Sequence, residues 1–121
     1  MAASSAGLHE PEDRLNNEVI DDHRAIVSIM EELEAIDWYT QRAQAANDPE
    51  LAAILVHNRD EEKEHAAMAL EWLRRRDAML DQHLRTYLFT SGSILEREAA
   101  AEASGASHGA GSLGIGDLRG T

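Results

Sequence analysis

One break divides a long region of this chain that otherwise has the character of continuous helix. Residues 8–91 contain no glycine and only two prolines, Pro11 and Pro49, the second within the triplet Asn47-Asp48-Pro49. Proline suits the first position of a helix, and an Asp before it can cap the free amides there. The triplet is therefore a turn that leads into a new helix, and it predicts an antiparallel hairpin of two long helices.

Apolar side chains recur on both sides of this turn at the spacings of an amphipathic helix. The first predicted helix starts at Pro11, the second runs from Pro49 to about Arg76, and a shorter third covers about Ala78 to Leu88. The fold class is therefore all-α: a two-helix hairpin plus a short third helix. Two helices alone give a thin core, so we expect dimerisation to complete a four-helix bundle, with each chain providing half.

The composition divides the chain into segments around this helical domain, which we place at residues 11–90. Residues 1–10 are small and polar, and we expect them to be a disordered N-terminus. Residues 91–110 are rich in Ala, Ser, Gly and Glu and contain few large apolar side chains, which predicts a flexible linker.

Large aliphatic side chains return in the last segment, residues 111–121, where glycines separate Leu113, Ile115 and Leu118. A free tail gains nothing by exposing such side chains unless another molecule receives them. We interpret the segment as a peptide that docks in extended form into a groove on another protein. A disordered tail with accidental leucines is the alternative.

The charge of the chain restricts its partners. Acidic side chains number 23 against 11 basic ones, for a formal net charge of −12. Such a surface repels nucleic acid and anionic membranes and attracts cations. The absence of Cys excludes disulfides and thiolate metal sites, and the sequence shows neither a membrane-spanning run nor a secretion signal. A cytoplasmic protein is the expectation.

Glu62 and His65 are the strongest candidates for metal ligands. Their spacing of three residues places a carboxylate and an imidazole on one face of the second helix, and two-metal carboxylate bundles use such a pair from each of two helices. Glu32 lies on the first helix at about the same distance from the turn, so the hairpin should bring it opposite the pair. The chain thus carries half a metal site, and two copies would complete it. A solvated charged face is the alternative.

Two other polar sets lie near these ligands. Glu31 and Glu34 share a neighbouring face of the first helix, and His57, Glu61 and Glu64 form a strip on the second. Either set could hold a hydrated divalent cation such as calcium loosely, or could simply be surface charge.

Trp38 and Tyr39 follow the acidic cluster of the first helix. They could shield a metal site or exchange electrons with it. Ordinary packing in a core or an interface explains them equally well.

Taken together, these segments resemble the encapsulated ferritins over roughly residues 9–90, and the C-terminal Gly-Ser-Leu-Gly-Ile-Gly-Asp-Leu-Arg-Gly resembles an encapsulin targeting peptide. The segments that carry the resemblance are Met30-Glu31-Glu32-Leu33-Glu34-Ala35, Asp37-Trp38-Tyr39, Asp48-Pro49-Glu50-Leu51, His57-Asn58-Arg59-Asp60-Glu61-Glu62-Lys63-Glu64-His65, Glu71-Trp72-Leu73-Arg74-Arg75 and His83-Leu84-Arg85-Thr86-Tyr87-Leu88-Phe89.

The resemblance implies a ferroxidase that oxidises Fe(II) to Fe(III) inside an encapsulin shell, which stores the mineral. It also implies that a homodimer holds two irons and that dimers assemble into a ring, typically a decamer. Residues 111–120 would contact the shell protein. The resemblance implies a di-iron site at Glu32, Glu62 and His65, with Tyr39 beside it. It also implies that metal enters past Glu31, Glu34 and Trp38. A weaker metal position is implied at His57, Glu61 and Glu64.

Several other classes of protein fit the residues less well or remain open. A hemerythrin-like oxygen carrier needs more histidine ligands than six scattered ones provide, and a rubrerythrin-like enzyme needs cysteines. A cargo protein that binds divalent metal without turnover, or a purely structural helical dimer, remains an alternative. Glutamate and imidazole suit Fe, Mn and Zn alike, so the choice of iron rests on the resemblance.

Overall fold

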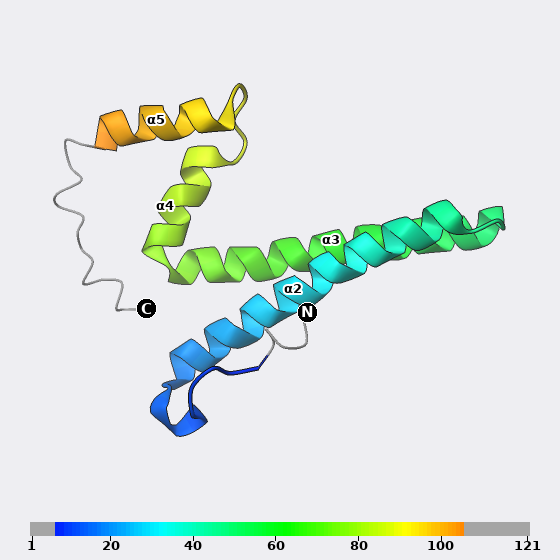
Figure 1. Cartoon of the computed structure of the whole chain (residues 1–121), viewed down its shortest axis with the longest axis horizontal. Helices are drawn as coiled ribbons and strands as arrows, with labels where there is room; N and C mark the ends of the chain where they lie inside the picture. Colours follow the sequence, from blue (N-terminus) through cyan, green and yellow to red (C-terminus); the bar gives the residue numbers. More distant parts are fainter. Residues whose placement is uncertain (1–6, 106–121) are drawn as a thin grey trace. The chain divides into compact units, whose positions relative to one another are not determined.

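A computed structural model describes residues 7–105, and all the regular structure in this range is helical (Figure 1). In chain order the elements are the 3-10 helix η1 (Glu12–Arg14) and the α-helices α2 (Asn17–Ala45), α3 (Pro49–Arg76), α4 (Ala78–Tyr87) and α5 (Ile94–Gly105). The chain forms two compact units that divide after Trp72, so the second unit begins within the last turn of α3. The predicted all-α class is confirmed for the described part of the chain.

The first long helix begins later than the prediction at Pro11. Pro11 precedes η1, and the backbone at Leu15 is extended, which separates η1 from α2. The Asn16 side chain then accepts a hydrogen bond from the Val19 amide at 2.8 Å. Asn is among the strongest N-cap residues, so this local cap fixes the start of α2 at Asn17.

The turn between α2 and α3 has the predicted structure. The Ala46 amide donates to the Arg42 carbonyl at 2.9 Å and closes α2. The Asp48 carboxylate accepts a hydrogen bond from the Leu51 amide at 2.9 Å, and α3 starts at Pro49 as expected. With only three residues between them, α2 and α3 run antiparallel; they lie close together toward the turn, and the N-terminal part of α2 diverges from α3 (Figure 1).

Charged side chains organise the start of α4 in the second unit. Asp77 caps the helix by accepting a hydrogen bond from the Leu80 amide at 2.9 Å. Asp81 accepts hydrogen bonds from both Arg85 of α4 and Arg74 of α3. These two guanidinium groups hold the pKa of Asp81 below its ordinary value. The Arg74 contact therefore joins the last turn of α3 to α4.

A helix occupies most of the segment predicted as a flexible linker. After a turn in which Phe89 and Gly92 have φ angles of 61° and 87°, the Ser93 hydroxyl accepts a hydrogen bond from the Glu96 amide at 3.2 Å, and α5 follows. The Ala and Glu content that resembled a linker also has high helix propensity, and the Ser cap gives that propensity a defined start. Residues 106–110 and the predicted docking peptide lie outside the described residues.

None of the residues from 7 to 105 is buried in the single chain. The large apolar side chains left more than about a third exposed include Ile26, Leu33, Trp38, Leu51, Ile54 and Met68 of the hairpin. Each hairpin thus leaves apolar surface uncovered, as expected for half of a four-helix bundle. None of the described helices is both long and apolar enough to cross a membrane.

Candidate metal centre

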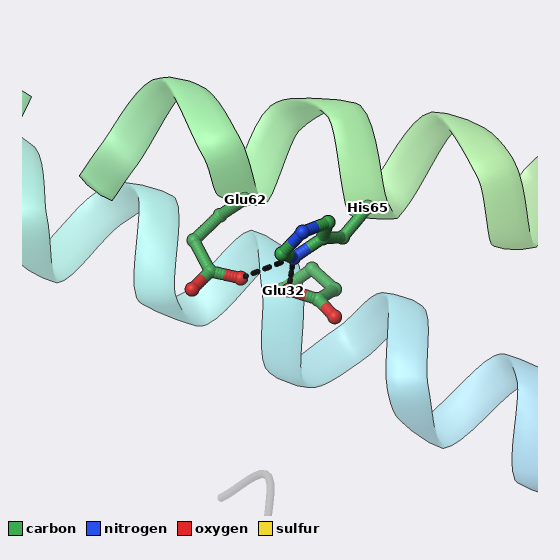
Figure 2. A group of neighbouring side chains, drawn as sticks. All are labelled: Glu32, Glu62 and His65. Carbon is green, nitrogen blue, oxygen red and sulfur yellow. Dashed lines mark ion pairs between the residues drawn. The ribbon is translucent and has the colours of Figure 1, made fainter. Parts of the chain in front are cut away.

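Three side chains of the hairpin converge on one point between its helices (Figure 2). Glu32 comes from α2, whereas Glu62 and His65 come from α3. One ligand atom from each lies within 4.8 Å of the other two. His65 Nδ1 is 3.4 Å from Glu62 Oε1 and 3.7 Å from Glu32 Oε1. Two carboxylates and an imidazole at this separation can all reach one divalent cation.

The geometry follows from the hairpin. The interval from Glu32 to the end of α2 has the same number of residues as the interval from the start of α3 to Glu62. Both side chains therefore lie about 20 Å from the turn. His65 is three residues beyond Glu62, which places its ring over the same face of α3. The predicted convergence of Glu32 with the Glu62–His65 pair is present in the structure.

Electrostatics at this point favour a cation. The pKa of Glu32 is raised, chiefly by a hydrogen bond shared with the Glu62 carboxyl, and further by partial burial and by the Glu62 charge. The same hydrogen bond, together with His65, lowers the pKa of Glu62. Of the two carboxyls, Glu32 is therefore the one that binds a proton more readily. A cation bound between them would neutralise the charges that raise its pKa.

The site is accessible and has few ligands. The side chains of Glu32 and Glu62 are each 24% exposed, and that of His65 is 45% exposed. Three protein ligands leave several positions of an octahedral ion open. The open positions could accept either further protein ligands or small molecules.

The other predicted ligands do not join this group. Among the described residues, Glu32, Glu62 and His65 form the one set of three or more side chains within ligating distance of each other. His57 Nε2 lies 3.9 Å from Glu61 Oε2, and both side chains are at least half exposed. The metal-binding roles expected for Glu31, Glu34, His57, Glu61 and Glu64 remain predictions.

A basic residue, Arg42, lies beside the aromatic pair Trp38 and Tyr39. The Arg42 guanidinium carbon is 5.5 Å from the centroid of the Tyr39 ring and 5.9 Å from that of Trp38. The spacings of three and four residues along one helix were the signal available in the sequence.

A hairpin that carries a carboxylate–histidine set and leaves its apolar face open has the features of half a bundle of the ferritin-like class. Comparison with known families identifies the family within this class. A profile of the EncFtn-like family matches residues 7–91, and the chain is a member of that family.

Similar proteins cover nearly all of the chain. The "Encapsulated ferritin-like protein" of Rhodospirillum rubrum is 61% identical over 99% of this chain and 93% of its own length. The "Ferritin-like protein" of Thermotoga maritima is 51% identical over 88% of this chain and 93% of its own length. A crystal structure of a Nitrosomonas europaea protein matches with a TM-score of 0.71 at 59% identity, over 73% of this chain and 97% of that one.

The raised pKa of Glu32 makes metal binding at this centre depend on pH. Because the pKa of Glu32 is raised above its ordinary value of 4.5, a metal ion binding just above that pH must release the proton. We expect the number of protons released per bound Zn²⁺ to rise as the pH is lowered from 7 to about 5. Calorimetry in buffers of different ionisation enthalpy measures this number.

Glu32→Gln should release fewer protons per Zn²⁺ at pH 5 than the native chain, whereas the exposed Glu50→Gln on α3 should match the native chain. Equal proton release from the native chain and Glu32→Gln would contradict a raised pKa of Glu32.

Proposed function

We propose that this protein is a ferroxidase: it oxidises Fe(II) to Fe(III) at a di-iron site formed between two chains. The observation that carries the proposal is the convergence of Glu32, Glu62 and His65 within 4.8 Å of one another across the hairpin. Membership of a ferritin-like family supports iron as the metal handled.

A second copy of the chain completes the site. In ferritin-like di-iron bundles, each of two helices contributes a Glu-x-x-His pair and each of the other two a single Glu. One hairpin holds half of this set, and a two-fold axis beside it would supply the other half from the same residues. The result is four carboxylates and two imidazoles around two irons, with positions left open for dioxygen.

The same two-fold axis also accounts for the exposed apolar surface. Four helices from two chains can bury faces that two helices leave open, and iron bound across the seam stabilises the dimer by mass action. Pairs of chains would assemble further into a ring, which we propose to be a decamer.

In this proposal the substrate is Fe(II), and dioxygen is the electron acceptor. Four Fe(II) ions provide the four electrons that reduce one dioxygen to two waters, with the uptake of four protons. The carboxylates stabilise the extra charge of Fe(III). Tyr39 lies beside the site, Glu31 and Glu34 collect incoming Fe(II), and His57, Glu61 and Glu64 hold a divalent cation more weakly.

The proposed location is the lumen of an encapsulin compartment. The names of two relatives support it: one is an encapsulated ferritin-like protein, and another is an encapsulin cargo protein of Myxococcus xanthus that is 35% identical over 66% of this chain. A ring of dimers cannot enclose a mineral, so the shell would store the Fe(III). We propose that residues 111–120 bind the shell.

Removing a ligand should abolish iron oxidation. We expect Glu32→Ala, Glu62→Ala and His65→Ala each to lower the initial rate of Fe(III) formation by more than about 100-fold, because even outer-sphere partners of a metal site are worth about 10- to 100-fold. The measurement is the ferric absorbance after oxygen is added to protein loaded anaerobically with Fe(II).

The control is Glu50→Ala, which removes an exposed carboxylate of α3 and should oxidise iron at the native rate. Fe(II) that binds stoichiometrically but is oxidised no faster than in buffer would instead indicate a cargo protein that binds metal without turnover. Native rates in all three ligand variants would place the site elsewhere.

The C-terminal peptide should govern loading into the shell and leave the chemistry unchanged. We expect deletion of residues 111–121 to lower the amount of protein captured in co-expressed encapsulin shells by at least about tenfold. The triple substitution Leu113→Ser, Ile115→Ser and Leu118→Ser should have the same effect. Several tails on one ring reinforce a weak individual affinity, so their joint loss has a large effect. The ratio of cargo to shell protein in purified compartments measures capture.

The free, tail-deleted protein should still oxidise Fe(II) at the native rate. Capture at native levels after the deletion would show that the shell recognises another part of the chain.

A further inference from the structure

Arg42 occupies an unusual position on the strongly acidic hairpin. Its guanidinium carbon lies 5.5 Å from the centre of the Tyr39 ring and 5.9 Å from the centre of the Trp38 ring. Both distances are within the range of a cation–π interaction, so a single cation interacts with two aromatic rings at once.

The two rings lie on the stripes of α2 that lead to the metal-binding carboxylates. Tyr39 follows Glu32 by seven residues, and Trp38 follows Glu31 by the same interval. Seven residues complete two helical turns to within about 20°, so each ring lies about 10 Å from its carboxylate along one face. Arg42 belongs to the next turn, between the two stripes.

No carboxylate stands three or four residues from Arg42 in the sequence, whereas Trp38 and Tyr39 precede it at those spacings. Among residues 7–105, no carboxylate pairs with Arg42, whereas Arg24 of the same helix pairs with Asp21 at 2.8 Å. Asp37, which precedes the two rings, accepts a hydrogen bond from Gln41 at 3.0 Å instead. The positive charge of Arg42 is thus left to act on the aromatic pair.

We propose that Arg42 protects Trp38 and Tyr39 from oxidation during ferroxidase turnover: it contacts both rings, and its charge opposes the loss of an electron from either one. The inference rests on the proposed function, because iron oxidation generates the oxidant. A positive charge close to a ring raises the energy needed to remove an electron from it.

The chemistry explains why such protection is needed. Full reduction of one dioxygen takes four electrons and four protons. When only two Fe(II) ions are present, two electrons are missing, and oxidisable side chains on the same hairpin, such as Tyr39, can supply them. Two Tyr39 phenols from two chains would each lose one electron and one proton to become phenoxyl radicals. Together with two Fe(II), one dioxygen and two protons, they would give two Fe(III) and two waters.

The test compares four full-length proteins: native, Arg42→Gln, Arg42→Lys and the control Arg24→Gln, which removes a positive charge elsewhere on α2. Each is loaded anaerobically with two Fe(II) per dimer, mixed with oxygen and frozen rapidly. The readouts are the initial rate of Fe(III) formation and the yield of the organic-radical signal by electron paramagnetic resonance.

We expect the radical yield of Arg42→Gln to exceed that of the native protein by about three- to fourfold, the order of effect of a unit charge at this distance in a solvated site. Arg24→Gln should match the native protein, and Arg42→Lys, which keeps the charge, should recover most of the protection. The initial rate of Fe(III) formation should stay within about twofold of native in all four proteins, because no metal ligand changes.

Equal radical yields from Arg42→Gln and Arg24→Gln, with iron oxidation intact, would overturn the role of Arg42. A yield from Arg42→Lys as high as that from Arg42→Gln would overturn the role of its charge. Absence of iron oxidation in the native protein would overturn the proposed function itself, so the two failures are distinguishable.

Discussion

The register of the α2–α3 hairpin is the constraint on which the metal centre depends. Glu32 and the Glu62–His65 pair meet because they stand at equal distances from a turn that a cap and a proline fix in place. One residue more on either side of the turn would rotate a ligand by about 100° and shift it by about 1.5 Å. The turn lies about 20 Å from the site, yet its geometry determines whether the three ligands share a cation.

Across residues 7–105, a single chain lacks both a buried core and a full set of metal ligands, and a second copy could supply both. Its hairpin buries no residue in the described range, and its metal centre offers only three ligands. Copies paired about a two-fold axis would cover the apolar faces and double the ligand set in the same step. The opposite pKa shifts of Glu32 and Glu62 reflect two carboxyls held close together, and a cation bound between them would neutralise their charges. Assembly and metal binding are therefore expected to reinforce each other.

The parts of the structure that the sequence predicted are those controlled by local patterns. Helices α3 and α4 and the turn at Asp48 follow from caps, a proline and helical periodicity, and the convergence at Glu32 follows from counting residues on either side of the turn. The start of α2 was misplaced because Pro11 and Asn16 both signal a helix start, and the intervening residues form only η1. Helix α5 was missed because Ala and Glu suit a linker and a helix alike. The contact of Arg42 with two rings could not be predicted with the same certainty, because the sequence gives its spacing from Trp38 and Tyr39 but not the conformation of its long side chain.

The most direct test of the central claim, a metal centre shared between two chains, is a crystal structure of the full-length protein soaked anaerobically with Fe(II). Anomalous scattering at the iron edge would locate the metals. The account predicts two irons next to a two-fold axis, each within about 2.0–2.2 Å of oxygen or nitrogen atoms of Glu32, Glu62 and His65, with both chains contributing ligands. Iron bound by these residues within one chain only, or symmetry-related copies of His65 too far apart to share a metal pair, would contradict it.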